Sequence, residues 1–442
     1  IKGETLGNVA FGIDYLANSK AFRLGDDIAV IGGGAAGLTA AYGCASEGMK
    51  TVVIDREETP GGVLLQCIHN GFGLHYFNAE LTGPEYAARV LKQAEDAGAS
   101  FLLSSTVMKI EDCGAEKILT VYSRADGVTL VHAKAVILAM GCRERCRGNL
   151  GIPGDRVAGI FTAGLAQRLL NVEGCLPGRK AVIVGSGDIG LIMARRLTWC
   201  GIEVKAVVEI MPYPSGLSRN IAQCLEDFNI PLYLSTGVTN IHGRDRVESV
   251  TVAPLENGLP QMDRAWKIEC DTVLFSVGLI PENELAKECG VALNPVTNGA
   301  WVDGNLMTNV QGIFSCGNVL HVHDLVDFVS EEALRCAACA VKWVRTEKKD
   351  PVLQGKTMCG EHLRYVVPNS YVPAGDGHFY MRPKIVASAA ELVVRAGERV
   401  ILRKKLRWVK PAEMIAVNLP AALTADCTAG ENLNFELEEV KA

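Results

Sequence analysis

The chain has 442 residues, a length that predicts several domains and does not suit a single small binding module. Its 44 Lys and Arg residues against 50 Asp and Glu residues give a formal net charge of −6, which provides no broad basic surface for a nucleic-acid backbone. Hydrophobic residues make up 48% of the chain and charged residues 21%, as in folded globular proteins. These numbers exclude a disordered chain and argue against nucleic acid as a partner.

Apolar runs and cysteines indicate the cellular compartment. No apolar run approaches the roughly 18 residues that span a bilayer, since the run at 135–141 ends in glycine and is followed by Cys-Arg-Glu-Arg. The 15 cysteines are odd in number and scattered, and the start of the chain has no secretory pattern. The sequence therefore predicts no transmembrane segment, reduced thiols and a cytoplasmic location.

Residues 27–34 are a short predicted apolar strand that runs into a glycine-rich motif. The motif is Gly32-x-Gly34-x-x-Gly37, and Asp55 ends the next predicted strand 18 residues after the last glycine. In dinucleotide-binding folds these glycines allow a tight turn, close approach of the backbone to a pyrophosphate, and packing of helix on strand. The helix N-terminus then faces the phosphates, while the acid can bond the ribose hydroxyls. The pattern predicts a first nucleotide site.

The same pattern recurs later in the chain. Gly185-x-Gly187-x-x-Gly190 follows a second apolar strand, and Glu209 ends the next strand 19 residues after the last glycine. A carboxylate at this position accepts hydrogen bonds from a free 2′-hydroxyl and repels a 2′-phosphate. The sequence therefore predicts a second nucleotide site that prefers NAD to NADP.

Three further segments lie between and after the two predicted nucleotide-binding folds, at 134–141, 271–287 and 310–318. With them the chain resembles the flavoproteins that have two dinucleotide-binding folds, the pyridine nucleotide-dependent FAD oxidoreductases related to glutathione and thioredoxin reductases. The resemblance spans about residues 25–345, because five motifs occur in that family's order. It implies FAD and NAD(H) as cofactors.

The resemblance implies an α/β fold with two Rossmann-like lobes, in which the NAD lobe is inserted into a discontinuous FAD lobe. Short β-like runs after about residue 350 predict a small β-rich C-terminal domain. The expected divisions are 1–25 for an entry segment or linker, 26–150 for the first part of the FAD lobe, 151–290 for the NAD lobe, 291–350 for the second part of the FAD lobe, and 351–442 for the β-rich domain.

The glycine motifs and the resemblance together assign residues to the cofactors. The residues expected at FAD are Gly32, Gly34, Ala35, Ala36, Gly37, Asp55, Arg56, Gly61, Gly62, Gln66, Val107, Ala139, Met140, Gly141, Gly317 and Asn318, and those expected at NAD are Gly185, Gly187, Asp188, Ile189, Gly190, Glu209 and Gly278. Two residues depart from the family pattern. Met140 replaces a threonine, and Asn318 replaces an aspartate that bonds the ribityl chain; an amide can still form that bond.

Residues 61–87 and 317–333 are similar to a branch that accompanies glycerol-3-phosphate dehydrogenase-type flavoproteins, and more distantly to amino-acid and opine oxidase subunits of multi-flavin complexes. This resemblance implies a redox subunit. Its partner would be another subunit that holds a flavin or an iron–sulfur centre and exchanges electrons with NAD(H) through this chain.

The segment after Gly61-Gly62 carries the candidate thiol. Cys67 stands alone there, with His69 two residues later, so the paired cysteines of disulfide reductases are absent from this position. A single thiolate beside a flavin can cycle through sulfenic acid, which leaves an NADH oxidase or peroxidase as the alternative function. The other interpretation is a packed thiol near FAD. His69 and His75 are either flavin-facing or structural.

His321, His323 and Asp324 directly precede a helix predicted at about 325–345. In the resembled fold this helix directs its N-terminus at the flavin pyrimidine ring, so one histidine is a candidate proton donor. The spacing also suits a metal ligand pair, but no further ligand cluster accompanies it, and no metal is predicted.

Other features stay open at this point. Cys336 and Cys339 fit a helix core better than an iron–sulfur site, and Cys142 with Cys146 fit a charged connector. The basic run at 403–407 fits a solvated edge strand or a surface for a partner protein. Residues 1–25 are either an ordinary arm or the exit from a missing upstream domain of the same polypeptide. A third function class is a non-catalytic assembly protein.

Overall fold

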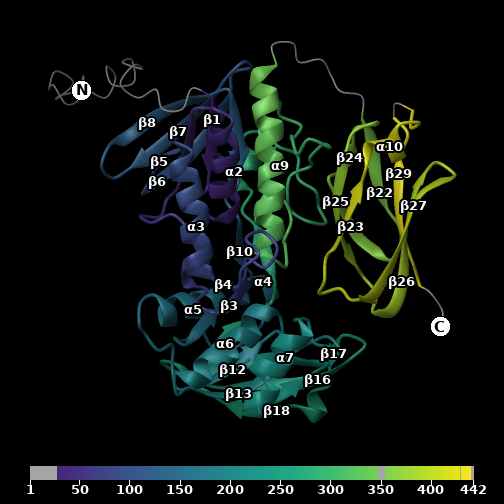
Figure 1. Ribbon diagram of the computed structural model, residues 1–442. Helices are drawn as coiled ribbons and strands as arrows, with labels where there is room; N and C mark the ends of the chain where they lie inside the picture. Colours follow the sequence, from purple (N-terminus) through teal and green to yellow (C-terminus); the bar gives the residue numbers. More distant parts are fainter. Residues whose placement is uncertain (1–26, 347–353, 429, 440–442) are drawn as a thin grey trace. The chain divides into compact units, whose positions relative to one another are not determined.

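The computed structural model describes residues 27–346, 354–428 and 430–439 (Figure 1). The predicted entry segment at 1–25 lies outside these residues. The chain forms two compact units, one from the residues up to Cys142 together with those from Pro281 onward, and one from Arg143–Ile280. The domain boundaries drawn from the sequence stay predictions.

The first unit is built on a five-stranded sheet of order β21-β9-β1-β2-β5, whose neighbouring strands are parallel. Its strands are β1 (Ile28–Ile31), β2 (Thr51–Ile54), β5 (Ser100–Leu102), β9 (Ala135–Leu138) and β21 (Ile313–Ser315). Every residue of β1, β2 and β9 is buried, as in a parallel sheet covered on both faces. This explains why these strands are continuous apolar runs.

Three helices accompany this sheet: α2 (Ala35–Ser46), α3 (Gly83–Asp96) and α9 (Val326–Arg345). Figure 1 shows α2 between α3 and α9. Small residues let α2 and α9 pack closely, since a Cβ on Gly43 would lie only 2.8 Å from Cβ of Ala337. The helix predicted at 325–345 is therefore a core element of the first unit.

The second unit repeats this topology. Its sheet has the order β11-β19-β12-β13-β14, with β11 (Ile160–Thr162), β12 (Lys180–Val184), β13 (Glu203–Val208), β14 (Leu232–Tyr233) and β19 (Thr272–Phe275). Its helices are α5 (Ala163–Asn171), α6 (Asp188–Trp199) and α7 (Ser218–Cys224). The strand before each glycine motif lies at the middle of its sheet, between the strand that follows the motif's helix and a strand from much later in the chain. Such a middle position is where doubly wound sheets bind ligands.

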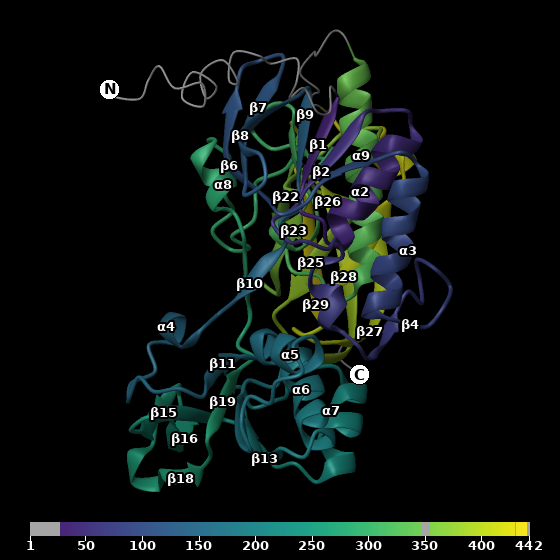
Figure 2. The same cartoon turned by 90° about the vertical axis from the view of Figure 1, so that its left-hand side faces the viewer.

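Each unit also carries an antiparallel sheet, which follows β5 and precedes β9 in the first unit, and follows β14 and precedes β19 in the second. The first consists of β6 (Ser105–Asp112), β7 (Lys117–Ser123) and β8 (Gly127–Ala133), which lie side by side in Figure 2. The second consists of β15 (Thr236–Gly243), β16 (Val247–Glu256), β17 (Leu259–Pro260) and β18 (Trp266–Glu269). The repeat is thus one of whole supersecondary units, beyond the glycine spacing.

The C-terminal part of the first unit is β-rich. A five-stranded sheet has the order β24-β22-β29-β26-β27, with β22 (Gly355–Cys359), β24 (Ser370–Tyr371), β26 (Ala387–Ala396), β27 (Arg399–Val409) and β29 (Leu433–Glu439). A three-stranded sheet contains β23 (Leu363–Val367), β25 (Gly377–Pro383) and β28 (Ile415–Leu419). One apolar cluster with Phe379, Leu392 and Phe435 fills this region. The basic run at 403–407 lies on β27, at the end of the five-stranded order.

Short elements complete the described chain. They are η1 (Gly62–Gln66), β3 (Asn70–Phe72), β4 (Leu81–Thr82), β10 (Cys142–Glu144), α4 (Arg147–Leu150), η2 (Glu226–Phe228), η3 (Met262–Arg264), β20 (Leu279–Pro281), α8 (Glu284–Glu288), η4 (Gly317–Val319) and α10 (Ala421–Thr424). The predicted fold class is confirmed: two Rossmann-like sheets, the second inserted into the first unit, precede a β-rich region. Within the described residues no helix has the length and apolar character to cross a membrane.

Candidate functional site

Three glycine-containing segments meet at the N-terminus of α2. The amide of Gly61 donates a hydrogen bond to the carbonyl oxygen of Gly33 at 2.7 Å. A Cβ on Gly62 would lie 3.0 Å from Cα of Gly34, and a Cβ on Gly317 would lie 2.7 Å from Cβ of Ala36. Segments far apart in the sequence therefore form one site in the first unit.

The N-terminus of α2 is open at this site. Gly34 is its N-cap residue, no side chain caps the helix, and its first turn contains no acidic residue. A Cβ on Gly34 would meet no atom within 4 Å. Because the first amides of a helix lack intrahelical partners and carry partial positive charge, such an end binds phosphate groups. The glycine loop thus fits the diphosphate of a dinucleotide.

Gly32 and Gly37 show why the motif requires glycine. Gly32 has φ +109°, and its Cβ would overlap the carbonyl oxygen of Ala139, which directly follows β9. A Cβ on Gly37 would overlap the carbonyl oxygen of Gly32. Asp55 follows β2 and accepts hydrogen bonds from the amides of Gly33 and Glu57. The predicted acid therefore reaches back to the loop.

The glycine loop of the second unit has a similar frame. Gly185 has φ +94°, and its Cβ would overlap the carbonyl oxygen of Ser276. Gly187 caps α6 without a side-chain hydrogen bond. Asp188 lies in the first turn, and its Oδ1 accepts bonds from the Leu217 amide at 2.8 Å and from Asn220 Nδ2 at 2.7 Å. The carboxylate next to the predicted phosphate position is therefore held by the chain's own donors.

Glu209 directly follows β13 and is only 4% exposed. Its Oε2 accepts bonds from the amide and the hydroxyl of Ser186, at 2.9 and 2.6 Å, and from Ser215 Oγ at 3.0 Å. Its Oε1 accepts the Met211 amide at 2.9 Å. The loop serine and the segment after β13 thus orient this acid, which the glycine spacing alone does not reveal.

The candidate thiol lies in the first unit just after η1. Cys67 is buried, and its thiol donates a hydrogen bond to the Val63 carbonyl oxygen at 3.3 Å. His69 packs beside Phe72, and His75 stacks on Phe328 of α9 with ring centroids 6.0 Å apart. All 15 cysteines lie among the described residues, and none of them forms a disulfide. These contacts are compatible with a packed thiol, and both interpretations of Cys67 stay predictions.

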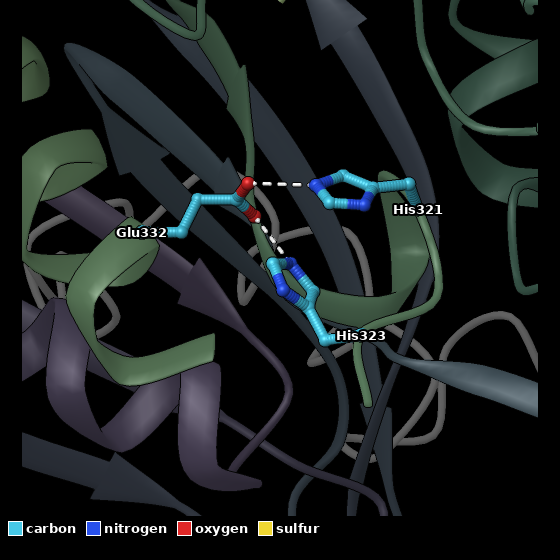
Figure 3. Close-up of side chains that lie close together, drawn as sticks. All are labelled: His321, His323 and Glu332. Carbon is cyan, nitrogen blue, oxygen red and sulfur yellow. Dashed lines mark hydrogen bonds and ion pairs between the residues drawn. The ribbon is translucent and has the colours of Figure 1, made fainter. Parts of the chain in front are cut away.

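His321 and His323 lie together with Glu332 of α9 (Figure 3). The Nε2 atoms of the two histidines lie 2.9 and 3.2 Å from the two carboxylate oxygens of Glu332. Oε1 of Glu332 also accepts the amide of Gly317 at 2.7 Å. All three side chains are buried. One acid therefore anchors both predicted histidines and the glycine that approaches α2.

Burial sets the charges of this cluster. Burial, reinforced by neighbouring His323, lowers the pKa of His321 to about 4, so this ring is neutral at neutral pH. Burial alone would raise the pKa of Glu332, but the two imidazoles and their hydrogen bonds hold it well below its ordinary value. Glu332 is therefore ionised at neutral pH. Each imidazole Nδ1 lacks a hydrogen-bond partner among the described residues.

The same three residues are spaced for metal binding, since their donor atoms lie within 4.8 Å of one another. The expectation that no further ligand accompanies the histidine pair is therefore wrong, whereas the prediction of no metal stays a prediction. The Glu332 carboxylate already accepts three bonds. A metal-bound histidine normally donates its second ring nitrogen to an acceptor, and among the described residues neither Nδ1 atom has one.

The sequence analysis missed Glu332. Its position carries a signal, because it lies four residues before Cys336 and eight before Ala340, both on the buried face of α9. A buried acid on a helix face needs partners nearby.

The remaining predicted residues are distributed around the two loops. Asn318 Oδ1 accepts the His323 amide at 3.0 Å and its Nδ2 lies 3.7 Å from Cys142 Sγ, so its side chain braces the turn. Ala35 and Ala36 begin α2, Gln66 ends η1, Met140 and Gly141 follow β9, Ile189 and Gly190 lie in α6, Gly278 precedes β20, Val107 packs from β6 against the first core, and Arg56 is exposed. Their cofactor contacts stay predictions.

Comparison with known proteins decides the family. The model of the pyridine nucleotide-disulphide oxidoreductases matches residues 26–342. The chain belongs to this family. The predicted family resemblance is thereby confirmed, and the family's members typically bind FAD and NAD(P).

Two curated relatives are named as subunits of larger enzymes. Hydrogen cyanide synthase subunit HcnB of Pseudomonas protegens is 26% identical over 284 residues, which cover 60% of this chain and 59% of the relative. An opine oxidase subunit of Agrobacterium tumefaciens is 26% identical over 419 residues, or 86% of this chain and 77% of the relative. The chain thus spans about three fifths of the length of the hydrogen cyanide synthase subunits that it matches.

Solved structures support the fold. Thioredoxin reductase of T. acidophilum superposes with a TM-score of 0.59 at 23% identity, covering 72% of this chain and 97% of that one. L-proline dehydrogenase of P. horikoshii gives a TM-score of 0.52 at 19% identity, covering 73% and 56%.

Proposed function

We propose that this family member is an FAD-dependent oxidoreductase that transfers electrons between NAD(H) and the redox centre of a partner subunit. The observation that carries the proposal is the duplicated site: each unit has an uncapped helix N-terminus at a glycine loop, and an acid at the end of the next strand contacts that loop. Two such sites in one chain suit two dinucleotides.

The first unit supplies the FAD site. The α2 amides and the loop at Gly32–Gly37 would hold the diphosphate, Asp55 the adenosine ribose, and the segment at 317–318 the flavin side of the molecule. When bound, FAD supplies the hydride and single-electron chemistry. The protein contributes orientation and a fixed electrostatic surrounding.

The second unit supplies the NAD site. Glu209 has one carboxylate oxygen with a single protein donor, which leaves it an acceptor position for a ribose hydroxyl. No arginine follows it at positions 210–217, whereas a 2′-phosphate needs a cation there. These features support NAD over NADP.

Two observations support electron transfer to a partner subunit: the absence of a second cysteine beside Cys67 in the sequence, and the names of the curated relatives. Cys67 has no second cysteine beside it in sequence, so a dithiol relay of the disulfide-reductase type does not operate there. The two curated relatives are subunits of hydrogen cyanide synthase and opine oxidase. A subunit of a multi-flavin dehydrogenase is the function that both observations support.

The test is anaerobic mixing of the yellow holoprotein with NADH, followed at the flavin absorption band. We expect rapid bleaching, then slow reoxidation when air or peroxide is admitted, because the electron acceptor in this proposal is the redox centre of the partner subunit. Rapid reoxidation with continuous NADH consumption would overturn the subunit proposal in favour of an oxidase or peroxidase. A purified protein without flavin that takes up no added FAD would overturn the redox function altogether.

A further inference from the structure

The turn segment, residues 317–324, is held from the α9 side by Glu332. As described above, this acid binds the Gly317 amide and both histidines of the segment. Gly317 in turn approaches Ala36 in the first turn of α2. A displacement of the turn segment would therefore reach the glycine loop directly.

The C-terminal β-rich region holds the same segment from the other side. Arg382 of β25 forms a two-pronged ion pair with Asp324, with Nη2 to Oδ1 at 2.7 Å and Nη1 to Oδ2 at 3.0 Å. Arg382 Nη2 also donates to the Val322 carbonyl oxygen at 3.1 Å. The amide of Met414, which precedes β28, donates to Asp324 Oδ2 at 2.6 Å. Two parts of the β-rich region thus converge on one carboxylate.

This ion pair differs from the surface pairs of the chain. The side chains of Arg382 and Asp324 are only 13% and 20% exposed. Burial alone would lower the pKa of Arg382, but Asp324 and Tyr365, through their charges and their hydrogen bonds to the guanidinium, together raise it. A two-pronged arginine–carboxylate pair is directional as well as strong, and removal of one partner leaves a charge poorly solvated. Such a contact fixes geometry.

Aromatic packing extends the contact to the histidine cluster. The ring of Tyr380, also in β25, lies 5.3 Å from that of His321 and 5.1 Å from that of His323. Arg335 of α9 lies over the Tyr380 ring, and its Nη2 donates to the hydroxyl at 3.3 Å. The buried face of β25 is therefore part of the cluster's enclosure.

We propose that the C-terminal β-rich region is a working part of the flavin site, and that Arg382 is a positioning residue that holds the turn segment in place for FAD through Asp324. The inference rests on the proposed function, because it concerns the same site. It assigns the region a role inside this chain in addition to any contact with a partner.

The experiment compares Arg382→Gln, Asp324→Asn and the double variant with wild type. Each is stripped of flavin and titrated with FAD, and the midpoint potential of the bound flavin is then measured. Each single variant should weaken FAD binding about tenfold. The double variant should bind FAD no more weakly than the single variant with the lower affinity, because the effects of coupled partners do not add. The midpoint potential should shift in each, and Arg382→Lys should recover part of the affinity. Arg395→Gln is the matched control, because Arg395 pairs with Glu436 at 3.2 Å within the five-stranded sheet.

The outcomes separate the two proposals. If the wild-type apoprotein takes up no FAD, the proposed function fails. If it binds FAD and the folded Arg382 and Asp324 variants match it in affinity and potential, this inference alone fails.

A wild-type measurement decides the matter if the variants do not fold. Hydrogen exchange of the holoprotein and the apoprotein should show greater protection of the β25 amides when FAD is bound, with no change in β27. Equal protection of β25 in the two states would overturn the inference.

Discussion

At the scale of the residue, Asp55 and Glu209, the acids that directly follow β2 and β13, are held by different partners. Asp55 is anchored by main-chain amides of the loop and of Glu57. Glu209 is anchored chiefly by serines, with Ser186 supplying both an amide and a hydroxyl. Because hydroxyls rotate, the second acid retains freedom to reorganise its bonds when a ligand arrives.

Glu209 should set the preference for NADH over NADPH. The Glu209→Gln variant loses a charged hydrogen bond to the ribose of NADH and the charge that repels the 2′-phosphate of NADPH. The ratio of the NADPH dissociation constant to the NADH dissociation constant should therefore fall about tenfold, which corresponds to about 1.4 kcal/mol. Quenching of protein fluorescence by each nucleotide measures the ratio. Glu203→Gln, an exposed change at the start of the same strand, is the control and should leave it unchanged. An unchanged ratio in Glu209→Gln would contradict the assigned role.

Cys67 should be dispensable for electron entry. Its thiol is buried and bonded to the Val63 carbonyl, and a hydroxyl can make the same bond in Cys67→Ser. The rate of flavin bleaching by NADH should therefore change by less than about twofold in stopped-flow mixing. Cys427→Ser, another buried thiol, controls for the burial of a hydroxyl. If Cys67→Ser, but not Cys427→Ser, loses the oxidation of NADH by oxygen or peroxide, the result would favour the oxidase or peroxidase.

At the scale of the element, the sheet of β6, β7 and β8 contains a buried cation. Lys117 is 1% exposed, and its Nζ donates to Asp112 Oδ1 at 2.8 Å and to the Gly114 carbonyl oxygen at 3.0 Å. The Asp112 carboxylate is half-exposed, so the two partners differ in solvation. The hydrogen bond from Lys117 lowers the pKa of Asp112 despite the opposing effect of burial.

Asp112→Ala should destabilise this sheet more than Lys117→Met does. Asp112→Ala removes the partner of a buried ammonium and should lower the free energy of unfolding by about 2 kcal/mol, whereas Lys117→Met removes the buried charge itself. Hydrogen exchange of the β7 amides should be faster by about thirtyfold in Asp112→Ala at neutral pH. The reverse order of the two variants would contradict this account.

The pH dependence of that difference has a definite sign. Because the folded-state pKa of Asp112 is lowered, its contribution is fully present above the unfolded pKa of about 3.9 and is lost as pH falls through the lower, folded value. The advantage of wild type over Asp112→Ala should therefore be constant between neutral pH and about pH 5, and disappear in stronger acid.

At the scale of the whole molecule, the second unit is an insertion with its own core. Residues 143–280 contain two apolar clusters around one sheet. The chain on either side of the insertion is already joined, because the Glu282 amide donates to the Gly141 carbonyl oxygen at 3.0 Å. The two units can therefore be separated by design.

Excised residues 143–280 should fold into a colourless protein that binds NADH. The remainder, with 142 and 281 joined by a short glycine linker, should bind FAD and stay oxidised when NADH is added. Circular dichroism, calorimetry and the flavin absorption band measure these outcomes. Full-length protein treated identically is the control. Flavin bound to the excised piece, or bleaching of the remainder by NADH, would contradict the assignment of one cofactor to each unit.

Gly32 and Gly185 lie against the carbonyl oxygens of Ala139 and Ser276, contacts that only the tertiary structure makes. Local sequence nevertheless determined the duplicated fold of this protein, because the glycine spacing recurs and apolar strands and helices follow from short periodicities. The family and the β-rich character of the last part were predictable for the same reason. Tertiary structure alone decided that Glu332 anchors His321 and His323, and that Arg382 reaches Asp324 from 58 residues away. Those contacts join buried charged and polar side chains that are distant in sequence, so local residue spacing does not predict them.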